Sequence, residues 1–140
     1  MDIIKKKLES ITRGVYLKYD TLKIFSLDEI NSLIRNTKQN KPLIVEEFKL
    51  HKYSHRYLLF MRDKQECVVC GAKASFWALQ RVGDLTNPHL NLWGFDKNNE
   101  IVLFTKDHII PKAKGGKNNM SNYQIMCDFC NGIKGDDYDE

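Results

Sequence analysis

The chain has 140 residues, of which 42% are hydrophobic and 29% charged, and its formal net charge is +4 at pH 7. This composition is typical of a soluble globular domain with a modest core, and it shows no low-complexity tract or internal repeat. The N-terminal residues lack the apolar run of a signal peptide, and no stretch is long enough to cross a bilayer. We therefore expect a cytoplasmic protein without a membrane partner.

The charge is unevenly distributed. Residues 136–140 are four acidic side chains and one tyrosine, so the rest of the chain is more basic than the total indicates. A basic body suits a polyanionic partner, although a charge of this size is weak evidence alone. We treat residues 136–140 as an acidic tail.

Residues 1–55 are expected to form a mainly helical extension whose role the sequence does not reveal. Ser26 to Glu29 read as a capping box, which predicts a helix running to about Lys38. Residues 15–25 are ambiguous, because Val15, Leu17 and Tyr19 alternate as a strand would. A further short helix is predicted from apolar residues spaced by three and four: Ile4, Leu8, Ile11 and Val15.

The stretch from 43 to 63 fits neither helical nor strand periodicity, although residues 57–61 are apolar enough to be core. His51 and His55 are four residues apart and could form a ligand pair on a helix. No acidic or thiolate side chain accompanies them at a useful spacing, so we expect ordinary surface histidines.

The second half of the chain predicts the order strand, loop, strand, helix. Asp96 to Asn99 read as the polar turn of a β-hairpin whose second strand ends at Asp107 and His108. A glycine-rich basic loop covers residues 112–119. A short strand at 124–126 and a helix at 128–134 follow, with Gly135 as the helix stop.

Four cysteines form two Cys-x-x-Cys pairs, Cys67 with Cys70 and Cys127 with Cys130. Two such pairs predict one tetrahedral zinc site, because thiolates are soft ligands and one turn can present both sulfurs. Four free or core cysteines are the disfavoured alternative. A filled tetrahedral shell leaves no open position for chemistry, so the zinc is expected to be structural.

A different cluster lies beside the second pair. Asp107 offers a carboxylate and Asn131 an amide oxygen, and both suit a hard divalent ion such as Mg²⁺ that keeps several waters. His108 can take a proton from water, although strand alternation directs it to the opposite face from Asp107. An ion, a base and vacant coordination positions are what hydrolysis of a phosphodiester requires.

The ordered set of motifs resembles the HNH endonuclease family. The resemblance covers residues from about 62 to 135 and rests on Asp107-His108-Ile109-Ile110-Pro111, Gly115-Gly116, Asn118, Ser121-Asn122 and Cys127-x-x-Cys130-Asn131-x-x-Lys134-Gly135. Arg62-Asp63 before Cys67-x-x-Cys70-Gly71 also fits the zinc-bearing members.

The resemblance implies an α+β fold: an HNH nuclease domain at residues 56–135 with a ββα-metal core, stapled by a zinc site of four cysteines. It implies that His108 is the general base, that Asp107 and Asn131 hold the catalytic Mg²⁺ or Mn²⁺, and that Asn122 braces the loop that orients the imidazole. Zn²⁺ is implied at Cys67, Cys70, Cys127 and Cys130.

Two positions depart from the commoner family pattern. Asn131 stands where many members have histidine, which bears on metal preference more than on activity. Tyr123 stands where an aliphatic residue is commoner.

Basic residues around the site are candidate contacts to nucleic acid phosphates: Lys112, Lys114, Lys117 and Lys134.

The leading hypothesis is thus a metal-dependent endonuclease that cuts DNA, double-stranded by expectation, through a one-metal mechanism; a homodimer would be compatible with it. The main alternative is a non-catalytic zinc-stabilised module that binds nucleic acid or protein. A third hypothesis is a transition metal at Asp107 and His108 that performs another hydrolysis.

Overall fold

The computed structural model describes residues 4, 7–8, 12–13, 17–38, 40–50, 54–83 and 87–137. The chain divides into two compact units, the first made of residues 1–51 and 76–91 and the second of residues 52–75 and 92–140. Over the part that the structure describes, every helix is too short or too polar to span a membrane.

In the first unit, strand β3 (Asp20–Ser26) leads directly into helix α2 (Leu27–Asn36). The predicted capping box is confirmed: the Glu29 N–H donates to Ser26 Oγ, and the Ser26 N–H donates to the Glu29 carboxylate, both at 3.2 Å. Ile30 and Ile34 lie on the buried face of α2, as the helical spacing of the apolar residues requires.

Strand β3 pairs antiparallel with β6 (Lys73–Arg81), in a register that runs from Asp20 opposite Arg81 to Ser26 opposite Phe76. The polar side chains buried there are hydrogen-bonded. Gln80 donates to Thr21 at 2.8 Å, and Trp77 Nε1 donates to the Asn31 amide oxygen of α2 at 2.9 Å. Satisfying such buried groups avoids a desolvation cost of about 1–3 kcal/mol each.

The first unit also contains two short antiparallel pairs, β1 (Thr12–Arg13) with β2 (Leu17–Lys18) and β4 (Leu43–Val45) with β5 (Phe48–Leu50). The expectation of a mainly helical N-terminal extension is not confirmed. Its described residues include the helix α2, helical residues at 4 and 7–8, and the strands β1 to β5. Strand β3 forms because it pairs with a strand far away in the sequence. Ile11 and Val15 of the predicted first helix lie outside the described residues.

The second unit contains helix α3 (His55–Arg62), strand β7 (His89–Phe95) from Leu92 onward, β8 (Ile101–His108), β9 (Tyr123–Cys127) and helix α4 (Asp128–Lys134). The hairpin between β7 and β8 confirms the predicted polar turn. There Asp96 accepts hydrogen bonds from the N–H groups of Asn98 and Glu100, at 2.8 and 2.9 Å.

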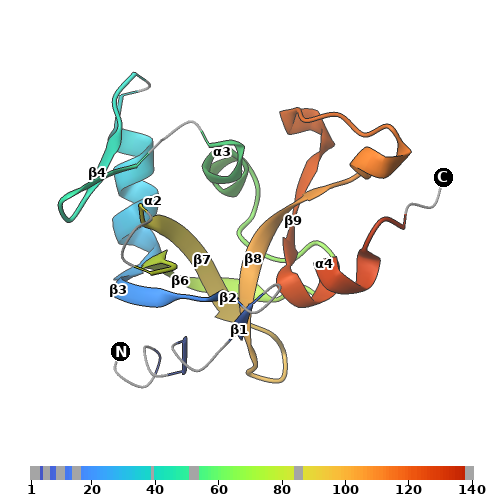
Figure 1. Cartoon of the computed structure of the whole chain (residues 1–140), viewed down its shortest axis with the longest axis horizontal. Helices are drawn as coiled ribbons and strands as arrows, with labels where there is room; N and C mark the ends of the chain where they lie inside the picture. The colour runs from blue at the N-terminus through green and yellow to red at the C-terminus, as the bar shows by residue number, and fades with distance from the viewer. Residues whose placement is uncertain are drawn as a thin grey trace. The chain divides into compact units, whose positions relative to one another are not determined.

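Strands β8 and β9 are antiparallel neighbours (Figure 1), with Asp107 opposite Gln124 and His108 opposite Tyr123. Helix α4 follows β9 without a break, because Cys127 ends the strand and its sulfur accepts the Cys130 N–H at the start of the helix. The predicted helix at 128–134 is confirmed, with Gly135 at its end in a conformation of positive φ (51°). A loop with two short 3₁₀ turns, Lys112–Lys114 and Met120–Asn122, joins β8 to β9.

Candidate functional site

The four cysteines form one cluster, with their sulfur atoms all within 4.8 Å of one another. Cys67 and Cys70 lie in the turn after α3, and that turn closes where the Gly71 N–H donates to the Cys67 carbonyl at 3.0 Å. The Cys70 and Cys127 sulfurs are 3.8 Å apart. That separation is the edge of a tetrahedron around an ion with Zn–S bonds of about 2.3 Å.

Burial shapes the acid–base chemistry of this cluster. It raises the pKa of Cys127 to about 11 and the pKa of Cys130 still further. Burial acts in the same direction on Cys67, but backbone N–H groups that point at its sulfur prevail and lower its pKa to about 7. Without a metal, Cys127 and Cys130 would therefore keep their protons at neutral pH, whereas a divalent cation would stabilise their thiolates. The donor set fits a structural Zn²⁺.

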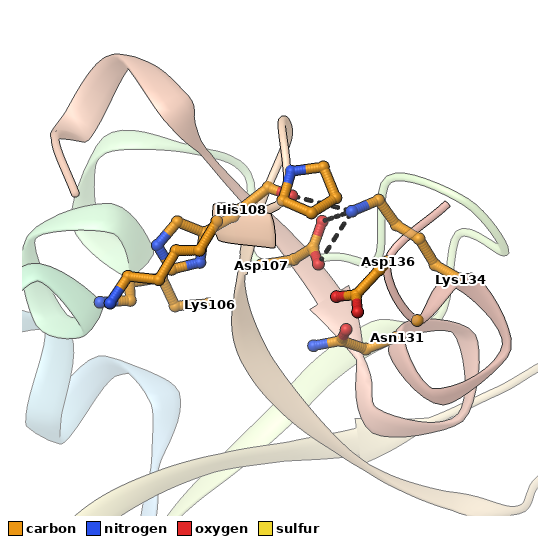
Figure 2. A pocket seen from close by; sticks show the side chains of 9 residues that line it. Lys106, Asp107, His108, Asn131, Lys134 and Asp136 are labelled. Carbon is orange, nitrogen blue, oxygen red and sulfur yellow. Dashed lines mark hydrogen bonds and ion pairs between the residues drawn. The ribbon is translucent and has the colours of Figure 1, made fainter. Parts of the chain in front are cut away.

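Asp107 is the buried carboxylate of a second site, with 5% of its surface exposed. Gln124, its cross-strand neighbour, donates to Oδ2 at 2.9 Å. The ammonium of Lys134 lies 3.1 Å from Oδ2 and 3.3 Å from Oδ1, and it also donates to the backbone carbonyl of His108 at 2.8 Å (Figure 2). Asp107 thus already binds a cationic group.

Asn131 lies on the face of α4 that packs against β8. Its amide nitrogen donates to Thr105 Oγ1 at 2.9 Å, and that hydroxyl donates to the Met126 carbonyl at 2.8 Å. These bonds fix the orientation of the amide. Figure 2 shows its oxygen turned toward the carboxylates of Asp107 and Asp136.

His108 leaves β8 on the opposite side from Asp107. Its Nε2 lies 2.7 Å from the amide oxygen of Asn118 in the following loop. An amide oxygen only accepts hydrogen bonds, so Nε2 is the donor in this contact, and in a neutral ring the lone pair is then on Nδ1. The imidazole and the Tyr123 ring also meet edge to face, with ring centroids 5.1 Å apart and an interplanar angle of 80°.

Asn122 holds the loop between β8 and β9 closed. Its amide oxygen accepts from the Ile110 N–H at 2.9 Å, while its amide nitrogen donates to the carbonyls of Ile110 at 3.1 Å and Lys117 at 3.0 Å. Gly116 lets the two ends of the loop approach each other, since a Cβ there would overlap the Ile110 carbonyl. The Asn122 side chain therefore has the contacts expected of a residue that braces the loop.

A pocket of about 280 Å³ brings Asp107, His108 and Asn131 together, although the two neighbouring β8 side chains leave the strand on different sides. Its lining residues are Lys106, Asp107, His108, Pro111, Lys112, Asn131, Lys134, Gly135 and Asp136. Lys114 and Lys117 are exposed on the loop and do not line it.

Two lining residues were missed in the sequence. Lys106 precedes His108 by two positions on the same strand face, which strand periodicity could have revealed. Asp136 was assigned to the acidic tail, but the chain turns back after Gly135, where the Asp137 N–H donates to the Lys134 carbonyl at 2.9 Å. Figure 2 shows the Asp136 carboxylate beside Asn131.

The sequence was compared with protein families, curated proteins and solved structures. Neither the curated proteins nor the solved structures contain a match to the chain. Residues 96–140, which include β8, β9, α4 and the pocket side chains, match the family model of HNH endonucleases. That match confirms the resemblance seen in the motifs over this segment: residues 96–140 are similar to the HNH endonuclease family.

Proposed function

We propose that the protein is a metal-dependent HNH endonuclease that hydrolyses DNA phosphodiester bonds by a one-metal mechanism. In this proposal β8, β9 and α4 form a ββα-metal core within a nuclease domain at residues 56–135. The observation that carries it is the pocket lined together by Asp107, His108 and Asn131.

Asp107 and Asn131 would hold the catalytic ion, Mg²⁺ or Mn²⁺. The fit rests on two features: both offer oxygen atoms, which hard divalent ions prefer, and the buried Asp107 carboxylate already pairs with a cation, the Lys134 ammonium. When bound, the ion would offset negative charge on the phosphate and on the leaving O3′.

His108 would act as the general base. Its Nδ1 lone pair takes a proton from the attacking water, while Asn118 accepts the Nε2 proton and keeps the ring in that tautomer. Asn122 contributes indirectly, because it fixes the loop that carries Asn118 through its bonds to the Ile110 and Lys117 backbone.

The cysteine cluster would hold a structural Zn²⁺. It joins the turn at residues 67–70 to the junction of β9 and α4, and α4 carries Asn131. A helix of seven residues is too short to be stable in isolation. Zn²⁺ at this site would therefore support the helix that carries Asn131 and would take no part in the reaction.

The DNA backbone would be bound by the exposed loop lysines Lys112, Lys114 and Lys117, whose contacts would be independent of sequence and weakened by salt. Lys134 could reach a phosphate only after release from Asp107. One site in the chain makes a nick in double-stranded DNA the elementary event, and two chains would be needed for a double-strand break in one encounter.

The test is supercoiled plasmid incubated with Mg²⁺ or Mn²⁺ and the His108→Ala variant. We expect wild type to nick and the variant to lose at least about 100-fold in rate, since general base catalysis contributes that much or more. His89→Ala is the matched control, because it removes an exposed histidine at the start of β7. Zinc content should be unchanged in both variants, and loss of the ring contact should cost His108→Ala about 0.5–1.5 kcal/mol of stability. Nicking by His108→Ala at the wild-type rate would reject the base assignment.

One observation favours the rival function of a non-catalytic binding module. The Lys134 ammonium occupies the Asp107 carboxylate, and an ion pair that Mg²⁺ could not displace would leave the site inactive. In that case DNA would shift in a gel while plasmid survived incubation with either ion. Mg²⁺-dependent nicking would exclude this alternative.

A further inference from the structure

Tyr123 occupies an unusual place beside the proposed base. It is the first residue of β9, directly opposite His108 in the strand register, and only 2% of its surface is exposed. A buried tyrosine brings a hydroxyl group that must find a partner, which an aliphatic side chain would not require. The ring is thus more than a filler of apolar space.

The ring of Tyr123 limits where the His108 imidazole can lie. The two rings meet edge to face at 5.1 Å and 80°, a favoured aromatic geometry worth about 0.5–1.5 kcal/mol. The ring also receives the Lys106 ammonium, 4.3 Å from its centroid. With Asn118 bonded to Nε2, the imidazole is held by a hydrogen bond and by a ring face.

Helix α3 fixes Tyr123 in turn. His55, the first residue of α3, lies 3.2 Å through Nδ1 from the Tyr123 hydroxyl, and the two rings are 5.4 Å apart. Arg62, the last residue of α3, donates to the Tyr123 carbonyl at 3.0 Å and to the Met120 carbonyl at 2.6 Å. Both ends of the helix therefore hold this one residue, by its side chain and by its backbone.

We propose that His55 and Tyr123 are positioning residues for His108: His55 anchors the Tyr123 hydroxyl, and the anchored ring sets the orientation of the imidazole. The inference rests on the proposed nuclease function and extends it to a residue outside the matched segment. His55 never touches the substrate in this arrangement. Its effect passes through Tyr123, so it should disappear when the hydroxyl is absent.

The experiment is a double-mutant cycle with His55→Ala, Tyr123→Phe and the combined variant. Single-turnover cleavage is measured with the protein in excess over DNA, and DNA affinity is measured separately without Mg²⁺. We expect each single variant to lose about 10-fold in cleavage rate, a modest change in orientation being enough for such a loss, with DNA affinity unchanged. The double variant should be no slower than Tyr123→Phe alone, because residues that act as one unit are not additive.

A conservative variant separates positioning from packing. His55→Gln keeps a group able to hydrogen-bond the phenol and should recover most of the wild-type rate. A thermal midpoint that falls equally in His55→Ala and His55→Gln, with a rate unaffected in both, would show that His55 serves stability alone. A loss of cleavage rate in the double variant equal to the product of the two single losses would likewise overturn the proposal.

A spectroscopic readout makes the result independent of catalysis. The His108 and Tyr123 rings are in contact. The NMR shifts of the His108 ring protons, assigned with His108→Ala, should therefore move in His55→Ala and in Tyr123→Phe but not in His89→Ala. Wild-type protein that never cuts DNA would refute the nuclease function. The NMR shifts would still show whether His55 and Tyr123 set the position of the His108 ring. Wild-type cleavage with unmoved shifts and an unaffected His55→Ala rate would refute the positioning alone.

Discussion

The ion pair between Lys134 and Asp107 gives the sharpest prediction about the metal site. Only 18% of the Lys134 side chain and 6% of the Asp107 side chain are exposed, and the ammonium also donates to the His108 carbonyl. In Lys134→Met the carboxylate would keep its bond from Gln124 but lose its buried cation. Removing one partner of a buried pair costs about 3–5 kcal/mol, because the other charge is left unpaired.

Asp107 borders a pocket, so water can reach it, and we take the lower end of that range. A loss of about 3 kcal/mol would lower the thermal midpoint of the zinc-loaded, Mg²⁺-free protein by roughly 10 °C. Mg²⁺ should then bind more tightly, since it no longer has to displace the ammonium. A net difference of about 1–2 kcal/mol corresponds to roughly a 5- to 30-fold lower dissociation constant.

Differential scanning calorimetry with and without Mg²⁺ measures the first effect, and isothermal titration calorimetry the second. Lys112→Met is the matched control, because Lys112 lines the same pocket but is exposed and lies outside the ion pair. It corrects for the general loss of one positive charge. A Mg²⁺ affinity of Lys134→Met no higher than that of Lys112→Met would refute Asp107 as the ligand that the ammonium masks.

Four further predictions concern the zinc cluster, two glycines and the loop lysines. Cys130→Ser should lose zinc, by elemental analysis, and with it a large part of the thermal stability, because structural zinc contributes folding free energy directly. Gly116→Ala should be destabilised by about 1–3 kcal/mol in denaturant titrations, since its Cβ would overlap the Ile110 carbonyl. Gly132→Ala on α4, whose Cβ would meet open space, should gain about 0.5–1 kcal/mol instead. Removal of the exposed loop lysines Lys112, Lys114 and Lys117 should weaken DNA binding equally across DNA sequences. The slope of log affinity against log salt should fall by about 0.9 for each phosphate that is no longer neutralised. Fluorescence anisotropy at several salt concentrations measures both effects.

The sequence predicts well those parts of the structure that local chemistry determines. The helix at 128–134 has the predicted bounds, because the Cys127 sulfur caps its start and Gly135 adopts a positive φ at its end. The turn at Asp96 also follows from local bonds, since a single carboxylate accepts two nearby N–H groups. Both signals lie within a few residues of the structure they specify.

The parts that the sequence could not predict depend on contacts between distant residues. Residues 20–26 form a strand because they pair with residues 76–81, and nothing within the first segment indicates that partner. The contact between His55 and Tyr123 spans 68 positions in the chain. His55 was expected to be an ordinary surface histidine, and its exposure agrees, but only the fold reveals the phenol beside it.

The same limit applies to Lys134. Its spacing from Asn131 places it near the metal site but cannot distinguish a phosphate contact from an ion pair. That distinction depends on Asp107, which lies 27 residues earlier and on another element. Burial of the Asp107 carboxylate favours the ion pair, because an unpaired buried charge costs far more free energy than an exposed lysine without a partner.

The two proposed metal sites are coupled through one short helix. Cys130 belongs to the sulfur cluster and Asn131, the next residue, belongs to the pocket, so a shift of this part of the helix would displace both. A seven-residue helix gains little stability from its own hydrogen bonds, and the sulfur cluster supplies the missing restraint at its first turn. Loss of zinc should therefore displace Asn131, although zinc does not contact that residue. The catalytic ion would depend on the structural one, because the cysteine site restrains the helix that carries the oxygen ligand.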